Sequence, residues 1–496
     1  MTDIEGASAD GTGASNPEST NQAASGGGDL RQLPSRRSFI AGTFAAALSQ
    51  PLLRAQTSAS KPNVLFFFTD QQRWDTIGAY GNPMGITPNW DKMAAEGTRF
   101  EFAYTPQPVC APTRSSMQTG KYPSTTGVVR NGGVLKDDEV TLPMLFSQAG
   151  YDTGYIGKWH LSETAEPGPV PLKRRGGYNQ FWLAANALEH TSVPMEGKMW
   201  DENNQPVEFK AEFRVDALTD HTVRFLRQKR TKPFFLFVSH LEPHFQNSTN
   251  TFIAPKGYAD RYKNNFYIPP DLAPFRGDWR SQLPEYYGII ARMDEQFGRV
   301  MDELKAQELL ENTIVVLTTD HGCHFRTRNA EYKRSCHEAS TRIPLIIRGP
   351  GFEPGKTVGQ LVSTISVPAT LLEATGQQVP AAMQGKSLMP LVQGKTSGWR
   401  NEVYIQMREE ALGRAIRTEQ WKYCVYDPTA TPQQPWSTNY VERHIYDVRN
   451  DPNELVNLAG RVDMRETAAM LRERLIARIV ENGEPRPVIT PAKFYA

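Results

Sequence analysis

The amino-acid sequence predicts an α/β fold: a large, mostly parallel sheet flanked by helices, followed by a smaller C-terminal α+β domain that carries an antiparallel sheet. Three short apolar runs, at residues 64–70, 233–240 and 313–322, carry the first part of this expectation. None of them alternates with polar residues, which is typical of strands buried on both faces, and each ends in polar residues. Helical patterns at 216–227 and 286–310 separate the runs, so a site is expected at the carboxyl ends of parallel strands.

The character of the chain changes near residue 395, where short strands separated by polar turns replace the long apolar runs. Strands are expected at 402–406, 415–418, 422–425 and 444–446, and a closing helix at 464–482. We therefore predict a catalytic domain over 61–394 and an α+β subdomain over 395–496.

Composition and charge narrow the class of protein. The chain has 496 residues, of which 39% are hydrophobic, enough for a large core and more than one domain. Its 55 Lys and Arg balance 54 Asp and Glu, which excludes the strong positive field of a general nucleic-acid binder. Four cysteines are too few and too scattered for a disulfide framework or a structural zinc site.

The N-terminal region resembles an export sequence. Residues 1–35 are rich in small and polar residues and are expected to be disordered. In 36–55, Arg36 and Arg37 precede a short apolar stretch that ends in small residues near Ala55, and this order resembles a twin-arginine signal. The alternative is that the two arginines are adjacent by chance. The signal predicts a bacterial periplasmic or extracellular protein that uses the twin-arginine machinery. No segment is long and apolar enough to predict an integral membrane helix.

Polar residues that end buried strands need a partner, because burying them without one costs free energy. Asp70 ends the first run, and Asp320 and His321 end the third. Carboxylate oxygens with an imidazole suit a divalent cation, and the absence of a thiolate cluster argues against structural zinc. For Asp70 alone, a helix cap is an equally good interpretation.

Residues 110–120 read CAPTRSSMQTG and resemble the signature of the type I sulfatases, Cys-x-Pro-x-Arg followed by Thr-Gly. The other landmarks of that family follow in the expected order: Gly157-Lys158-Trp159-His160, Pro243-His244, Asp320-His321-Gly322, Lys333, Glu338 and Arg342-Ile343-Pro344. The resemblance covers almost everything after the signal. It implies an alkaline phosphatase-like fold and a sulfuric ester hydrolase, with a carbohydrate sulfate as the expected substrate.

The resemblance also implies the chemistry of the site. In that family a formylglycine-generating enzyme oxidises the motif cysteine, here Cys110, to formylglycine, whose hydrate attacks sulfur beside a cation. Ca²⁺ is the expected ion, with Mg²⁺ or Mn²⁺ as alternatives. The ligands implied are Asp70, Gln71, the modified Cys110, Asp320 and His321. The catalytic residues implied are Cys110, Arg114, Lys158, His160, His244 and Lys333, with the division of roles between His244 and Lys333 left open.

Two departures from the family pattern leave other functions open. Gln71 and His321 stand where many members have a carboxylate and an asparagine, so the ligand set is less anionic. Similar substitutions occur in phosphonate monoester hydrolases, so a phosphonate monoester or phosphodiester hydrolase with the same nucleophile is one alternative. A non-catalytic protein that binds sulfated glycans is the other.

The roles of several residues outside the motifs are separate hypotheses. The substrate contacts are unknown, and His324 and Arg326 are candidates because they lie close in sequence to Asp320. Cys323 and Cys336 could pair in an oxidising compartment or remain two buried thiols. Cys424 is expected to pack on a strand. His240 and His244 have the spacing of a helical zinc pair, but Pro243 between them excludes such a helix.

Overall fold

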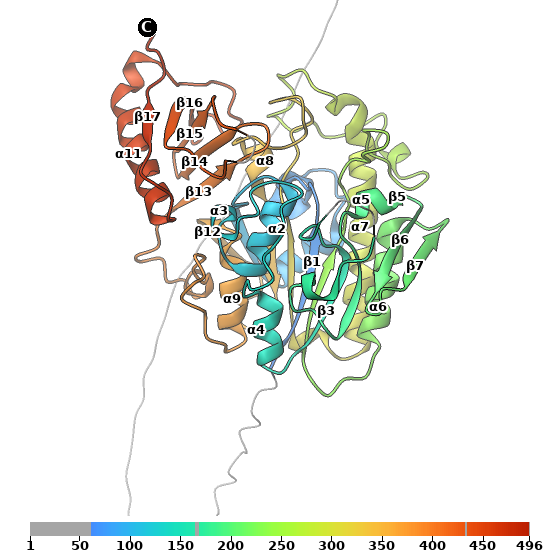
Figure 1. Cartoon of the computed structure of the whole chain (residues 1–496). Coiled ribbons are helices and arrows are strands. Elements are labelled where there is room, and N and C mark those ends of the chain that lie inside the picture. Colours follow the sequence, from blue (N-terminus) through green and yellow to red (C-terminus); the bar gives the residue numbers. More distant parts are fainter. Residues whose placement is uncertain (1–60, 164–167, 432–433, 496) are drawn as a thin grey trace, which may run out of the picture. The chain divides into compact units, whose positions relative to one another are not determined.

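A large sheet of twelve strands forms the centre of the computed structural model (Figure 1). The three apolar runs are strands β1 (Asn63–Thr69), β8 (Phe234–Ser239) and β9 (Thr313–Thr319). They lie side by side with β3 (Asp152–Lys158) and β4 (Phe181–Ala185) in the order β9, β1, β8, β3, β4, all parallel. The predicted parallel core is therefore confirmed.

The margins of this sheet make it mixed rather than wholly parallel. The outer strands are β2 (Thr98–Tyr104), β5 (Ser192–Val193), β6 (Glu196–Asp201), β7 (Pro206–Lys210), β10 (Arg342–Ile343), β11 (Leu345–Arg348) and β12 (Lys356–Ser363). Strand β11 runs antiparallel to β9, and β6 runs antiparallel to β4, so both sides of the parallel core end in antiparallel pairings.

Helices cover both faces of the sheet, which explains why β1, β8 and β9 carry apolar side chains on both faces. In β1, Leu65 and Phe67 pack in one core, whereas Phe66 and Phe68 pack in another on the opposite face. The first core contains α1 (Pro88–Ala95), α6 (Arg214–Leu226) and α7 (Trp279–Ala306). The second contains α2 (Cys110–Thr119), α4 (Leu142–Gln148), α9 (Ser366–Ala374) and α10 (Met389–Val392). The short helices are α3 (Pro123–Thr126), α5 (Leu188–Thr191) and α8 (Glu338–Thr341).

The C-terminal part forms a second sheet of five strands. Strands β13 (Glu402–Met407), β14 (Leu412–Thr418), β15 (Trp421–Asp427) and β16 (Asn439–Asp447) are antiparallel, and each contains one of the four predicted strands. The closing helix is α11 (Arg465–Glu481), which packs on this sheet. Strand β17 (Val488–Thr490) pairs parallel to β16 and was not predicted, because three residues are too short to carry a pattern.

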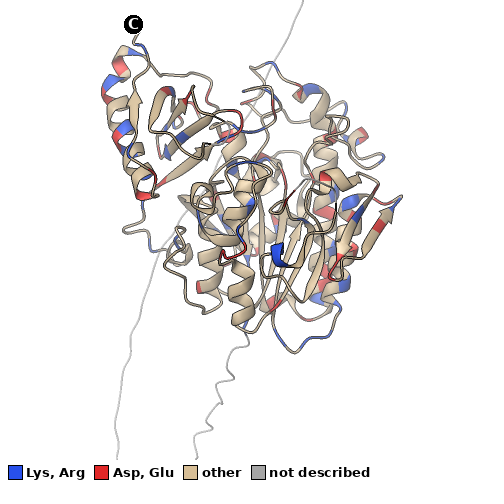
Figure 2. Cartoon of the chain, in the orientation of Figure 1, with Lys and Arg blue, Asp and Glu red and all other residues tan. Residues whose placement is uncertain are grey.

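The structure describes residues 61–163, 168–431 and 434–495, so the predicted tail at 1–35 and the signal at 36–55 lie outside it. Within the described ranges, no helix combines the length and the apolar character needed to cross a membrane. Basic and acidic residues are interspersed over the described elements, in keeping with a net charge of +1 (Figure 2). The division of the chain near residue 395 stays a prediction.

A buried ionic cluster joins the two sheets. Lys422 on β15 lies 2.7 Å from Glu338 of α8 and 2.7 Å from Glu454, which follows β16. Arg417 on β14 lies 3.2 Å from Glu338, and the Tyr104 hydroxyl on β2 donates to the same carboxylate at 2.8 Å. Burial opposes the charge of Glu338, but Lys422 and Arg417 hold its pKa down at about 2. The cluster thus fixes the C-terminal sheet against the segment that follows Lys333.

We expect the change Lys422→Met to lower the free energy of unfolding by about 3–5 kcal/mol, because it leaves two buried carboxylates without their shared partner. Urea denaturation followed by circular dichroism measures this loss. Lys263→Met removes an exposed pair with Asp260 and should cost no more than about 1 kcal/mol. Equal small losses in both variants would show that the buried cluster does not hold the two sheets together.

Candidate active site

The parallel pairing of β1 with β9 brings two carboxylates together. Thr69 and Thr319 are register partners, so Asp70 and Asp320, which follow them, meet at the same edge of the sheet. Both carboxylates are fully buried. The main chain fixes Asp320, because its Oδ1 accepts hydrogen bonds from the Gln71 amide at 3.1 Å and from its own neighbour's amide at 2.9 Å. Two negative charges are therefore placed side by side, where they need a positive partner.

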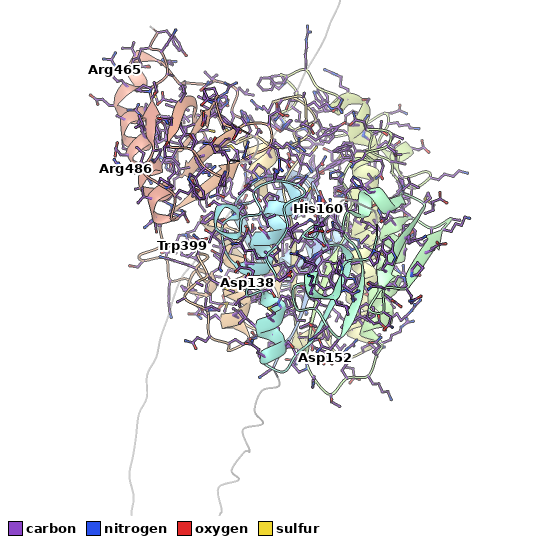
Figure 3. All side chains as sticks on the ribbon, in the orientation of Figure 1. Asp138, Asp152, His160, Trp399, Arg465 and Arg486 are labelled. Atoms are coloured by element: carbon purple, nitrogen blue, oxygen red, sulfur yellow. The ribbon has the colours of Figure 1, made fainter. Side chains whose placement is uncertain are left out.

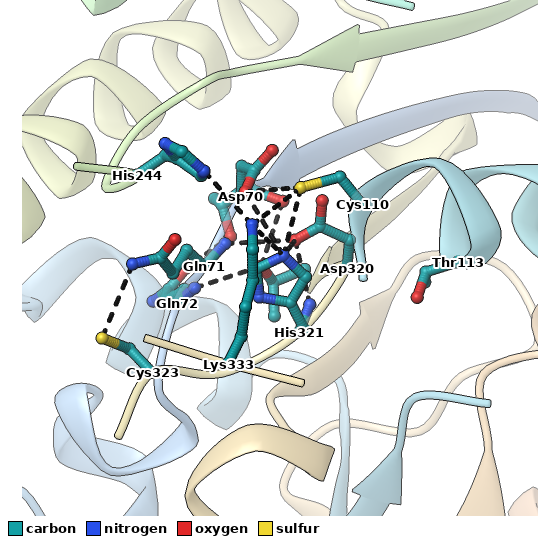
Figure 4. A network of polar contacts seen from close by, with 12 residues as sticks. Asp70, Gln71, Gln72, Cys110, Thr113, His244, Asp320, His321, Cys323 and Lys333 are labelled. Carbon is teal, nitrogen blue, oxygen red and sulfur yellow. Dashed lines mark hydrogen bonds and ion pairs between the residues drawn. The ribbon is translucent and has the colours of Figure 1, made fainter. Parts of the chain in front are cut away.

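Cys110 is the first residue of α2 and points into this pair of carboxylates (Figure 4). The helix begins there because Val109 is extended and Pro112, which has no amide hydrogen, fits the first helical turn. The Sγ atom of Cys110 lies 3.0 Å from Lys333 Nζ, 3.3 Å from His321 Nε2 and 3.7 Å from Asp70 Oδ1. The thiol is 1% exposed, so it meets these groups in a nearly dry environment.

Arg114 lies one helical turn after Cys110 on the same face of α2. Its Nη2 lies 3.0 Å from Asp70 Oδ2 and 3.2 Å from Asp320 Oδ2, so one guanidinium bridges both carboxylates. Its Nη1 donates to the Lys158 carbonyl at 2.9 Å and to Ser239 Oγ at 2.6 Å. Arg114 therefore connects the carboxyl ends of four strands: β1, β9, β3 and β8.

Lys158 and His160 reach the site from the carboxyl end of β3. Figure 3 labels Asp152, the first residue of β3, and His160, which lies two residues after the end of that strand. Lys158 Nζ lies 2.8 Å from Asp70 Oδ2 and 2.9 Å from Glu189 Oε1. His160 has a positive φ of 60°, and a hydrogen bond from its side chain is one of the interactions that lower the pKa of Cys110.

Two histidines direct their Nε2 atom toward the site. His321 Nδ1 lies 3.0 Å from the Gly322 carbonyl and His244 Nδ1 lies 2.6 Å from the Phe245 carbonyl. A carbonyl only accepts, so each Nδ1 carries the proton and each Nε2 keeps a lone pair. Lys333 Nζ donates to both, at 3.1 Å to His321 and 3.2 Å to His244.

Charges within the cluster shift several pKa values. Burial alone raises the pKa of Asp70, but Lys158 and other neighbouring cations outweigh burial and hold that pKa well below its usual range. Burial, reinforced by Asp70, raises the pKa of Asp320 to about 7. Burial opposes ionisation of Cys110, yet Lys158 and Lys333 bring its pKa well below the usual value, which favours the thiolate.

The donor atoms of this cluster fit a divalent cation. One ligand atom from each of Asp70, Cys110, Asp320 and His321 lies within 4.8 Å of all the others. Gln71 Oε1 is buried and has no hydrogen-bond partner among the described residues, although its Nε2 contacts Cys323 Sγ at 3.6 Å. The oxygens of Asp70, Gln71 and Asp320 with the His321 imidazole match Ca²⁺, Mg²⁺ or Mn²⁺, whereas the unmodified sulfur of Cys110 would suit a softer metal. A cation there would also relieve the repulsion that keeps Asp320 hard to ionise.

The structure brings together every residue that the sequence assigned to the nucleophile and the metal, but it places the two candidate substrate contacts elsewhere. His324 is fully buried and its Nε2 lies 3.0 Å from the Lys333 carbonyl, so it supports the main chain of that residue. Arg326 lies over the Tyr332 ring and pairs with Asp278 at 3.5 Å. Neither contacts Cys110.

Two residues of the site were missed. Glu189 lies in a segment without any sequence pattern, so nothing pointed to it. Ser239 was visible as the polar end of β8, but its role as a partner of Arg114 depends on strand order, which the sequence does not show.

The remaining cysteines are separate buried thiols. Cys323, Cys336 and Cys424 are all free, which decides the open choice between a pair and two thiols for Cys323 and Cys336. Cys424 packs on β15, as expected, with its Sγ 3.9 Å from Met407 Sδ.

Comparison with known protein families shows which family the chain belongs to. The sulfatase family model matches residues 62–377, and a model described as N-sulphoglucosamine sulphohydrolase, C-terminal, matches residues 330–481. The chain therefore belongs to the type I sulfatases of the alkaline phosphatase superfamily. It is an enzyme, a sulfatase, and this favours catalysis over a purely glycan-binding role.

Individual relatives of known name align with most of the chain. An ulvan-active sulfatase of Formosa agariphila is 29% identical over 445 residues, which is 86% of this chain and 83% of that protein. An N-acetylglucosamine-6-O-sulfatase of Bacteroides thetaiotaomicron is 26% identical over 502 residues, covering 84% of this chain and 86% of its own.

Solved structures match the fold. The crystal structure of the protein yidJ from Bacteroides fragilis superposes with a TM-score of 0.76 at 25% identity, covering 87% of this chain and 98% of that one. The phosphonate monoester hydrolase of Agrobacterium radiobacter reaches 0.63 at 22% identity, covering 85% and 96%. The latter likeness concerns the fold alone.

Glu189 offers a test of the buried charge network. Burial opposes its ionisation, but Lys158 lowers its pKa from 4.5 to about 2. Because the carboxylate of Glu189 is easier to ionise in the folded than in the unfolded protein, its ionisation stabilises the fold at pH values above the unfolded pKa of 4.5. This stabilisation is lost as the pH falls toward 2. We expect Glu189→Gln to cost on the order of 2–3 kcal/mol at pH 7 and clearly less at pH 3.

Thermal melts of wild type and variant at both pH values measure this difference. Glu163→Gln, which removes an exposed carboxylate, should leave the melting temperature nearly unchanged at both. A Glu189→Gln deficit that does not shrink at pH 3 would contradict the assigned pairing with Lys158.

Proposed function

We propose that this sulfatase hydrolyses a carbohydrate sulfate with formylglycine made from Cys110 as nucleophile and a divalent cation held by Asp70, Gln71, Asp320 and His321. The observation that carries the proposal is the position of Cys110 Sγ, 3.0 Å from Lys333 Nζ and within the cluster of metal-ligand atoms. The relative that acts as an N-acetylglucosamine-6-O-sulfatase supports a sugar substrate.

The cation and the formylglycine would supply the two things that a sulfate ester resists: neutralisation of its equatorial oxygens and an oxygen nucleophile. The residues of this chain would do the rest. Arg114 holds the two carboxylates that face the cation, at 3.0 and 3.2 Å, and so sets the geometry of the nucleophile's surroundings. Lys158 adds a fixed positive charge beside Asp70, which favours binding of an anion.

Proton transfer would fall to three residues. Lys333 is protonated, because Cys110 and Asp70 raise its pKa against the effect of burial, and it points at the nucleophile position. This suits a donor to the departing alcohol. His244 has a lowered pKa, owing to burial and Lys333, and accepts from that lysine, so it would orient the donor. His160 is proposed as the base that returns residue 110 to its resting form.

A phosphonate monoester or phosphodiester hydrolase remains the second candidate. Gln71 and His321 stand where many members have a carboxylate and an asparagine, so the ligand set is less anionic, and similar substitutions occur in phosphonate monoester hydrolases. Turnover of an aryl sulfate against a phosphonate monoester separates the two functions.

The proposal includes the route to an active enzyme. The segment 36–55 would direct the chain through the twin-arginine machinery to the periplasm or beyond, and a formylglycine-generating enzyme would convert Cys110. The catalytic part would span 61–394 and the smaller part 395–496. The sugar, the linkage and the position of its sulfate depend on contacts outside the cluster.

Modification of Cys110 gives the first test. In protein from a host that makes formylglycine, the peptide around residue 110 should show the mass of CHO in place of CH₂SH. Cys110→Ala should reduce aryl sulfate turnover by at least about a thousandfold while the circular dichroism spectrum stays native. Cys424→Ala removes another buried thiol and should remain active. Activity that survives in Cys110→Ala would refute the nucleophile.

Metal removal gives the second test. We expect a chelator to abolish turnover and Ca²⁺, Mg²⁺ or Mn²⁺ to restore it, because an uncompensated anionic cluster repels the sulfate. Asp320→Asn should weaken cation binding at least about tenfold in isothermal titration calorimetry. Asp463→Asn, which lies in an exposed pair with Arg461, serves as the control. Full activity after exhaustive chelation would rule out the proposed cation.

A further inference from the structure

A second cluster of metal-binding side chains lies where the C-terminal sheet meets the segment before α8. Cys336, His337 and His444 each offer one ligand atom, and these three atoms lie within 4.8 Å of one another. The two imidazole rings have their centroids 5.3 Å apart. Among the described residues, only this thiol–imidazole cluster and the active-site ligands bring three or more such side chains together. The proposed reaction does not use it.

Two separate parts of the chain build the thiol–imidazole cluster. Cys336 and His337 directly precede α8 and follow Lys333 closely in the sequence. His444 lies on β16 as the register partner of Cys424 on β15, so both side chains lie on the same face of the C-terminal sheet. The buried ionic cluster holds α8 against β15 at this junction. The thiol–imidazole cluster therefore exists only because the two parts are packed together.

Both imidazole rings of the cluster are in the state that binds a metal. Neither histidine forms an ion pair with a carboxylate within the described ranges. Burial first, and nearby arginines second, lower the pKa of both rings, that of His444 to about 4. A neutral ring keeps the lone pair that a metal ion needs. Cys336 is fully buried, whereas His444 is partly exposed and gives an ion an entry from solvent.

Hydroxyl groups contact the ring nitrogens of both histidines. The Tyr446 hydroxyl lies 3.0 Å from His337 Nε2 and 3.4 Å from His444 Nδ1. Ser335 Oγ lies 3.1 Å from His337 Nδ1. Whichever nitrogen of His337 binds an ion, the other therefore keeps a hydroxyl partner. Such partners fix the tautomer and the direction of metal-binding histidines.

A second thiol lies next to the cluster. Burial, and after it a hydrogen bond with Cys336, raise the pKa of the Cys424 thiol, and both sulfurs are free. Neighbouring thiols of this kind either pair in an oxidising compartment or serve together as metal ligands. Cys424 can thus complete a set of two sulfurs and two imidazoles, which is a common tetrahedral set for zinc.

We propose that the thiol–imidazole cluster, with Cys424 as its fourth ligand, is a structural Zn²⁺ site. Sulfur and imidazole ligands select a borderline-soft ion, whereas the oxygens of the active site select a hard one. Binding releases the protons of both thiols, and the two thiolates cancel the charge of the ion. The ion ties β15 and β16 to the segment that carries Lys333 and takes no part in catalysis. The scattered cysteines argue against zinc in the sequence, but folding brings two of them together with two histidines.

Cobalt absorption in metal-free Cys110→Ala protein tests the site. This variant lacks the active-site thiol, so a sulfur-to-cobalt charge-transfer band must come from another cysteine. We expect added Co²⁺ to produce this band together with the visible bands of tetrahedral coordination, and Zn²⁺ to displace them. His444→Ala in the same background should weaken Co²⁺ binding at this site by at least about tenfold, because it removes one ligand.

His221→Ala is the matched control, since it removes a partly buried histidine of α6 that lies outside the cluster. It should leave the cobalt spectrum and the affinity unchanged. Added Zn²⁺ should raise the melting temperature of the metal-free Cys110→Ala protein by a few degrees, because it binds only the folded form. The rise should be smaller when His444→Ala is present and the same when His221→Ala is present.

Three results would overturn the zinc site. The first is a folded Cys110→Ala protein that shows no sulfur-to-cobalt band, a result that does not depend on any further variant. The second is a band that His444→Ala leaves unchanged. The third is a disulfide between Cys336 and Cys424 in protein purified without reductant. None of these measurements needs turnover, so the zinc site and the proposed sulfatase reaction stand or fall separately.

Discussion

The juxtaposition of Asp70 and Asp320 is the constraint on which the rest of the site depends. The parallel register of β1 and β9 forces these two buried carboxylates together, and the main chain fixes Asp320 through two amides. Such an arrangement is unfavourable without positive charge. Arg114 and Lys158 supply part of that charge, and the ligand atoms of Asp70, Cys110, Asp320 and His321 lie close enough together to hold a cation that would supply the rest.

The helix α2 turns this charge arrangement into a site for chemistry. Cys110 and Arg114 lie one turn apart, so fixing Arg114 between the two carboxylates also fixes the direction of Cys110. The C-terminal sheet contributes from the other side, because Lys422 holds Glu338 just beyond Lys333, and Glu409 holds Arg334 next to it. The two sheets therefore share the task of positioning residue 110 and its neighbours.

Much of this was predictable from the sequence, for a physical reason. Strands covered on both faces need apolar side chains on both, so β1, β8 and β9 were evident as apolar runs without alternation, and the polar residues at their ends pointed to the site. Glu189 was not predictable, because it lies in a segment without periodicity, and the contact of Ser239 with Arg114 depends on a strand order that the sequence does not show. The antiparallel margins of the large sheet were missed because short edge strands carry little pattern.

A crystal structure of the converted enzyme grown with Mn²⁺, with anomalous scattering to locate the ion, tests the central claim most directly. The account predicts one ion bound by oxygens of Asp70 and Asp320, with residue 110 present as formylglycine beside it and Arg114 still bridging the carboxylates. An ion bound elsewhere, or Asp70 and Asp320 paired only with Arg114 and Lys158 at saturating Mn²⁺, would contradict it.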